Sequence, residues 1–187
     1  MRRLSCALVT LALVVVASSC ARQSGPFVAS SFGSFFNDNF GRDRRPFPNT
    51  GVDYQDVLGA PVLAPADGVV VDTPDEAICR VGLVIEHAPW QRWTRYCGLR
   101  DRLVATGQAV KRGQPIGTFG QAGTASGPAG LDYPVHVELW TRKPAGLPEE
   151  AFHKGLLLDP EKFMVGCFSL DRTYPTDRFA PTYPARC

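Results

Sequence analysis

Short apolar segments alternate with turn residues along most of this chain, and this pattern predicts an all-β fold. From residue 51 onward, each apolar run is only a few residues long and is bounded by Gly, Pro, Asn or Asp, as expected for strands joined by turns. The predicted strands cover residues 61–65, 69–71, 82–87, 92–97 and 114–120. Because a short turn segment separates 82–87 from 92–97, we expect these two strands to form an antiparallel hairpin.

The alternation is clearest at residues 135–140. Three apolar side chains point to one face of this predicted strand, whereas His136 and Glu138 point to the other. The Gly-, Ala- and Ser-rich residues 121–133 precede it and predict a surface loop at the rim of a groove. Pro148 is followed by two glutamates, and this order predicts the start of a short helix near the C-terminus.

These elements predict a single compact domain, mainly antiparallel, over residues 45–165, with a groove across its sheet. Residues 20–44 lack hydrophobic periodicity but contain five phenylalanines, so we expect an arm that packs on the domain. Residues 166–187 contain several prolines and end in a cysteine. We expect an irregular tail there, closed by a disulfide.

The first residues predict export. Two arginines precede an apolar run that ends before Ser18-Ser19-Cys20, and this order is typical of a secretory signal peptide, here residues 1–19. Ala17-Ser18-Ser19-Cys20 resembles a bacterial lipobox, which predicts lipid on Cys20 and a membrane anchor. Ala21 resembles the signal for sorting to the outer membrane. An ordinary signal peptide and an uncleaved anchor are the alternatives.

Charge excludes a nucleic-acid-binding surface. The chain has 20 basic and 18 acidic residues, and loss of Arg2 and Arg3 with the signal peptide balances the two. No run of basic residues is present, so we expect no nucleic-acid partner.

Four cysteines remain after the signal segment and Cys20 are set aside. An even number in an exported chain favours disulfides, and four cysteines allow three connectivities. Cys79 and Cys97 flank the predicted hairpin, whereas Cys167 and Cys187 bracket the tail. We therefore predict the pairs Cys79–Cys97 and Cys167–Cys187.

Several motifs, in order, resemble the lysostaphin-type (LytM-like) zinc metallopeptidase domain, the twenty-third metallopeptidase family. The resemblance covers residues 41–164, and its pieces are Thr50 to Tyr54, Gly59 to Val70, Gly82 to His87, Tyr96 to Leu99, Val110 to Gly120, His136 to Leu139 and Leu158 to Pro160. It implies a peptidase fold that acts on the peptides of peptidoglycan, with a zinc ion held by two histidines and one aspartate. Two further histidines would then activate water and stabilise the transition state.

This chain keeps two of those five positions. Asp53 and His136 match metal ligands, but Asn49 stands where the first ligand histidine is expected. Gly98 and Pro134 stand where the two catalytic histidines are expected. Because catalytic zinc usually has three protein ligands, and neither Gly nor Pro can transfer a proton, the resemblance implies lost catalysis and an incomplete metal site.

The other candidate residues have ordinary structural interpretations. We expect His87 to be a hydrogen-bonded strand-end histidine and His153 to be exposed on the C-terminal helix. Glu138 could support His136 or pair with an arginine on the neighbouring strand. For Asp53 and His136, a hydrogen-bonded pair and a weak zinc site both stay open.

The resemblance implies one main function and two alternatives. Degenerate domains of this family act as activators of cell-wall amidases and as peptidoglycan-associated division factors. We therefore expect an inactive envelope lipoprotein of the periplasm that binds peptidoglycan or a cell-wall hydrolase, with no cofactor. The alternatives are an active zinc endopeptidase with a rearranged site, in which His87 or a neighbour joins the metal, and a purely structural lipoprotein.

Overall fold

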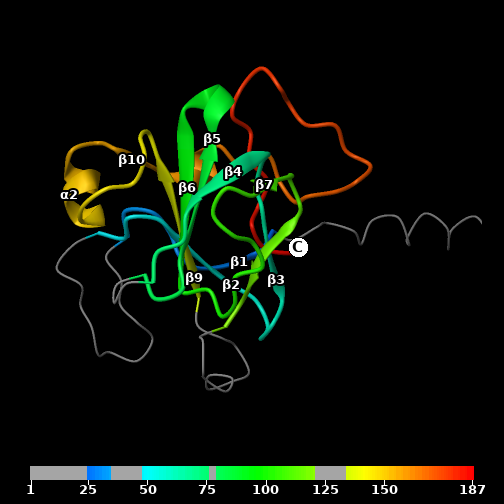
Figure 1. Ribbon diagram of the computed structural model, residues 1–187, viewed down its shortest axis with the longest axis horizontal. Helices are drawn as coiled ribbons and strands as arrows, with labels where there is room; N and C mark the ends of the chain where they lie inside the picture. The colour runs from blue at the N-terminus through cyan, green and yellow to red at the C-terminus, as the bar shows by residue number, and fades with distance from the viewer. Residues whose placement is uncertain (1–24, 35–47, 76–78, 121–133) are drawn as a thin grey trace, which may run out of the picture.

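A computed structural model describes residues 25–34, 48–75, 79–120 and 134–187 (Figure 1). The predicted signal peptide, Cys20, most of the predicted arm and the predicted surface loop at 121–133 lie outside these residues. The described strands are β1 (Phe27–Ser30), β2 (Val52–Gln55), β3 (Pro61–Leu63), β4 (Gly68–Asp72), β5 (Leu83–His87), β6 (Arg92–Cys97), β7 (Ala109–Val110), β8 (Pro115–Thr118), β9 (Val135–Trp140) and β10 (Leu157–Leu158). In the described parts of the chain, no helix is long and apolar enough to cross a membrane.

The sheet is antiparallel throughout, which confirms the predicted fold class. Its order is β1-β2-β9-β6-β5-β4-β7, with β10 added beside β9, and β3 and β8 form a second, two-stranded sheet. The predicted hairpin is present as β5 and β6, joined by a short 3-10 turn (Ala88–Trp90). The predicted helix is α2 (Pro148–His153), with Pro148 in its first turn and Glu149 and Glu150 near its positive end.

One face of the large sheet forms the core, because apolar residues alternate along its strands. Val52 and Tyr54 of β2 lie beside Val137 and Val135 of β9, and all four are buried. They pack in one cluster with residues of β5, β6, β3 and β8. The opposite face of the same strands carries the polar side chains, so the alternation that builds the core also gathers the candidate site.

His87 belongs to this core and not to the polar face. Its Nδ1–H donates to the carbonyl of Asp67 at 2.8 Å, and its Nε2 accepts from the Thr94 hydroxyl at 2.9 Å. Burial lowers the pKa of His87 to about 4, so the ring is neutral at physiological pH. Both ring nitrogens are therefore used locally.

The tail is irregular, and it is also built into the core. Phe179, Ala180 and Ala185 are buried, and the backbone of Thr182 donates to the carbonyl of Pro65 at 2.8 Å. Both predicted disulfides, Cys79–Cys97 and Cys167–Cys187, are present. The burial of the tail was not predicted from its prolines.

Arg112 connects the tail to the rest of the domain through hydrogen bonds, and a substitution at this position tests the connection. Its guanidinium donates to the carbonyls of Pro65 at 2.7 Å and Ala180 at 2.8 Å, and it lies 4.4 Å from the centre of the Tyr174 ring. Arg112→Met keeps the aliphatic stem but leaves a buried carbonyl without its donor. We expect a loss of about 1–3 kcal/mol in the free energy of unfolding, measured by urea denaturation.

Lys111→Met is the matched control. Lys111 forms an exposed ion pair with Asp67, and such pairs contribute less than about 1 kcal/mol. Equal losses for the two variants would show that Arg112 does not hold the tail.

Candidate functional site

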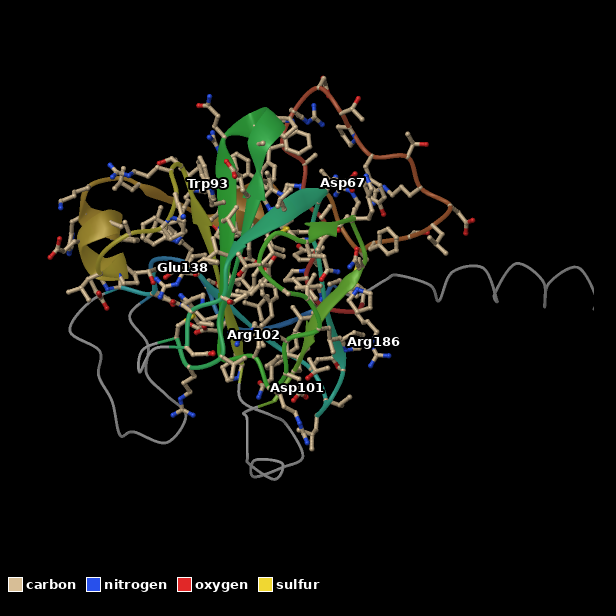
Figure 2. The ribbon with its side chains drawn as sticks, in the orientation of Figure 1. Asp67, Trp93, Asp101, Arg102, Glu138 and Arg186 are labelled. Atoms are coloured by element: carbon tan, nitrogen blue, oxygen red, sulfur yellow. A yellow bond between two sulfur atoms is a disulfide. The ribbon has the colours of Figure 1, made fainter. Side chains whose placement is uncertain are left out.

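The antiparallel pairing of β2 with β9 brings together residues that are far apart in the sequence. Asp53 lies directly opposite His136, and on the other side of β9 His136 lies opposite Cys97 of β6. Glu138, which is labelled in Figure 2, lies two residues further along β9, on the same face and opposite Arg95 of β6. The structure thus places Asp53, His136 and Glu138 in one polar row.

His136 is held between two carboxylates. Its Nδ1 lies 2.7 Å from Asp53 Oδ1, and its Nε2 lies 3.3 Å from Glu138 Oε1. Its side chain is 20% exposed. Burial alone would lower the pKa of His136, but the hydrogen bonds and negative charges of Asp53 and Glu138 outweigh it and raise the pKa to about 9. His136 is therefore an imidazolium at neutral pH, and both of its N–H groups donate to carboxylates.

Glu138 is a fully buried carboxylate supplied with donors from several elements. The Thr50 hydroxyl donates to Oε1 at 2.9 Å, and the Trp140 indole donates to Oε2 at 2.7 Å. Arg95 of β6 lies 3.8 Å from the same Oε2. Burial alone would raise the pKa of Glu138, but His136, Arg95 and Trp140 together hold it below its usual value. Glu138 therefore both contacts His136 and pairs with a cross-strand arginine.

Asn49 faces the row with its amide nitrogen. Nδ2 donates to Asp53 Oδ2 at 3.2 Å and lies 3.0 Å from the Ser30 hydroxyl, whereas Oδ1 accepts from the backbone of Gly51 at 3.4 Å. The carboxylate of Asp53 requires a donor, and this requirement fixes the orientation of the amide. Two backbone hydrogen bonds also hold Asn49: its N–H donates to the carbonyl of Ser34, and its carbonyl accepts from the N–H of Gly33.

Sequence reasoning missed Ser30 and Thr50. Ser30 ends β1, in an arm without a periodic pattern, so no local signal pointed to it. Thr50 is the first residue of a recognisable motif, but its bond to Glu138 depends on a register between residues 88 positions apart. Only the pairing of β2 with β9 reveals that contact.

The described residues do not fit a zinc ion in this arrangement. Two ligands of a tetrahedral zinc, each about 2.0–2.1 Å from the metal, are separated by about 3.3 Å, whereas Asp53 and His136 are 2.7 Å apart. Asn49 presents a hydrogen-bond donor, which cannot be a ligand. Across the described part of the chain, no group of three or more His, Cys, Asp and Glu residues could hold a metal ion.

The two positions without catalytic side chains adjoin each other. Gly98 has a backbone φ of 81°, a conformation that residues other than glycine rarely adopt. A Cβ atom added there would lie 3.2 Å from the carbonyl oxygen of Pro134. A histidine at position 98 would therefore be strained by both its backbone and its neighbour. Cys97, the preceding residue, carries the disulfide to Cys79.

Thr50, His136 and Asp53 form a hydroxyl–imidazole–carboxylate series, but it cannot activate a nucleophile. Thr50 Oγ1 lies 3.3 Å from His136 Nε2, yet the hydroxyl donates to Glu138 at the shorter distance of 2.9 Å. A protonated imidazole has no lone pair to take its proton. His87 is engaged in the core and His153 is exposed on α2, so neither supplies a base.

Comparisons of the sequence with family profiles and with known proteins point to the same family. The sequence profile described as Peptidase family M23 matches residues 47–145. The peptidoglycan DD-endopeptidase ShyA of Vibrio cholerae is 38% identical over 99 residues, which are 53% of this chain and 22% of ShyA. ShyB of the same organism is 40% identical over 98 residues, 52% of this chain and 22% of ShyB. The match therefore spans about a fifth of each of these relatives.

Solved structures share the fold. The catalytic domain of lysostaphin from Staphylococcus simulans superposes with a TM-score of 0.56 at 19% identity, over 74% of this chain and 91% of that one, a likeness of fold alone. A zinc-containing peptidase from Vibrio cholerae superposes with a TM-score of 0.50 at 31% identity, over 67% of this chain and 38% of that one.

The pKa of His136 can be checked by following the histidine ring signals in NMR spectra as a function of pH. We expect His136 to lose its proton near pH 9 and His87 to stay neutral down to about pH 4. Because the pKa of His136 is raised by folding, its ion pairs stabilise the protein fully below the unfolded value of about 6.5. That contribution is lost as the pH rises toward 9.

Glu138→Gln removes one of the two carboxylates and should lower the pKa of His136. A wild-type His136 that titrates at or below the unfolded value would contradict the ion-paired arrangement.

Proposed function

This chain belongs to peptidase family M23, and on that premise we propose that it is a non-catalytic member that binds or regulates in the bacterial cell envelope. The proposal depends mainly on one observation, the absence of proton-transfer groups at the two positions expected to be catalytic. Gly98 and Pro134 occupy the two positions where the family resemblance implies catalytic histidines, and neither has a group that can move a proton. General acid–base catalysis contributes roughly 10²–10⁴-fold to a rate.

The remaining polar residues support the same proposal. His136 is an imidazolium paired with Asp53 and Glu138, so it can neither ligate zinc nor act as a base in this state. Glu138 is buried and saturated with donors. The fold of the family is retained, and a fold can serve a binding role without the catalytic groups that other members carry.

The names of the relatives direct the proposal to the cell wall. ShyA and ShyB are peptidoglycan DD-endopeptidases by name, so the proposed ligand is either peptidoglycan or a hydrolase that acts on it. We place the protein in the periplasm, anchored through lipid on Cys20 and sorted to the outer membrane. A cell-wall amidase is the partner that the family resemblance favours.

An active zinc endopeptidase is the alternative, and the proximity of Asp53 to His136 favours it. It requires His136 to lose its proton, the two side chains to separate and a third ligand to enter. Among the described residues, Asn49 would have to turn its amide over, at the expense of its bonds to Ser30 and Asp53. His87 would have to leave the core.

The first test is hydrolysis. The purified mature protein should release no soluble muropeptides from isolated sacculi, because it lacks both proton-transfer groups. Added to a limiting amount of a cell-wall amidase from the same bacterium, it should increase the release of dye from labelled sacculi. Release of muropeptides by the protein alone, abolished by Asp53→Ala, would establish the endopeptidase instead.

The second test is restoration of the metal site. Asn49→His supplies a third ligand beside Asp53 and His136, so we expect this variant to bind zinc in calorimetric titrations where wild type shows no binding. Addition of His136→Ala to Asn49→His should remove the gained binding. Tight, stoichiometric zinc binding by wild type would refute the non-catalytic assignment.

A further inference from the structure

A loop of residues 167–178 projects from the body of the protein, seen as the orange-to-red segment in Figure 1. The chain leaves and returns at one place. Val165 donates its backbone N–H to the carbonyl of Pro181 at 2.9 Å, and Tyr183 donates to the carbonyl of Gly166 at 3.1 Å. The Cys167–Cys187 disulfide closes the same base. A compact surface loop whose ends meet is an Ω-loop, and such loops are frequently functional.

Tyr174 is the centre of the loop's internal frame. Its hydroxyl accepts from the backbone of Ser169 at 2.7 Å and lies 3.2 Å from the carbonyl of Cys167. Its ring is stacked with Phe168 at an interplanar angle of 14°. The guanidinium of Arg112, which is itself fixed by two carbonyls, lies 4.4 Å from the ring centre. These contacts hold the part of the loop from Cys167 to Tyr174, although it has no helix or strand.

This frame does not serve the hydrophobic core. None of residues 169–178, all of which the structure describes, is buried, and the burial of the tail begins at Phe179. Leu170, the fourth residue of the loop, is 90% exposed and is the most exposed large apolar side chain among the described residues. Ordering a loop costs conformational entropy, and a loop that is already ordered loses less of it on binding.

We propose that residues 167–178 form a preformed docking element, which inserts Leu170 into an apolar pocket of a partner protein. Single exposed leucines are common on protein surfaces. The distinguishing observation here is that a separate frame of hydrogen bonds, ring contacts and a disulfide holds this leucine outward. The loop also lies outside residues 47–145, which match the family.

The charges of the loop favour a protein over the other occupants of the envelope. The loop carries two exposed charges of each sign, from Asp171, Arg172, Asp177 and Arg178. This balance gives no attraction to an anionic membrane. The rings of Phe168 and Tyr174 are half-buried in the frame and offer no open platform for a sugar. A pocket one leucine wide, rimmed by charges of both signs, matches the loop.

The test uses the full chain in its own bacterium. A photo-crosslinking phenylalanine derivative replaces Leu170 in one strain and Leu103 in another, because Leu103 is also exposed, at 53%, and lies outside the loop. We expect one discrete protein adduct from position 170 and none from position 103. The crosslinked protein is then identified by mass spectrometry, purified and used as the probe in binding measurements.

Affinity for that purified protein decides the proposal. Leu170→Asp should weaken binding at least 10-fold, Leu170→Met should restore most of it, and Leu103→Asp should change it by less than about twofold. No protein adduct from position 170, adducts to lipid or glycan only, or equal binding by Leu170→Asp would overturn the proposal.

The inference rests on the proposed regulatory role, but the two can fail separately. Muropeptide release by the protein alone would refute the non-catalytic role whatever position 170 contacts. Leu170→Asp binding its partner as tightly as wild type would refute only the docking loop.

Discussion

The antiparallel register of β2 against β9 is the constraint on which the rest of the site depends. It sets Asp53 opposite His136, and the two side chains meet at 2.7 Å. The same register sends Val52, Tyr54, Val135 and Val137 into the core. A slip by one residue would exchange the two faces, burying charge and exposing the core. Core packing and site geometry are therefore set by one pairing.

This register places two carboxylates in the polar row, so their negative charge must be neutralised whether or not a metal is present. Two carboxylates, Asp53 and Glu138, flank a single ring, and the structure balances them with a proton on His136 and with Arg95. Buried carboxylates are costly unless they are paired and hydrogen-bonded. The protonated ring thus supplies positive charge at the place where the family resemblance implies a zinc ion.

Much of the fold and the outline of the site could be predicted from the sequence. Alternation at 135–140 correctly placed His136 and Glu138 on one face, and turn residues correctly marked the hairpin of β5 and β6. The bonds of Ser30 and Thr50 could not be predicted, because they depend on long-range register. The burial of the tail was also hidden, since its prolines end regular structure without preventing apolar packing.

We propose that a protonated histidine, and not a zinc ion, joins Asp53 to the other residues of the row. The most direct measurement is anomalous diffraction at the zinc absorption edge from crystals grown with excess zinc. We expect no anomalous peak between Asp53 and His136, with the two side chains in direct hydrogen-bonding contact. A peak within about 2.1 Å of both side chains would contradict it.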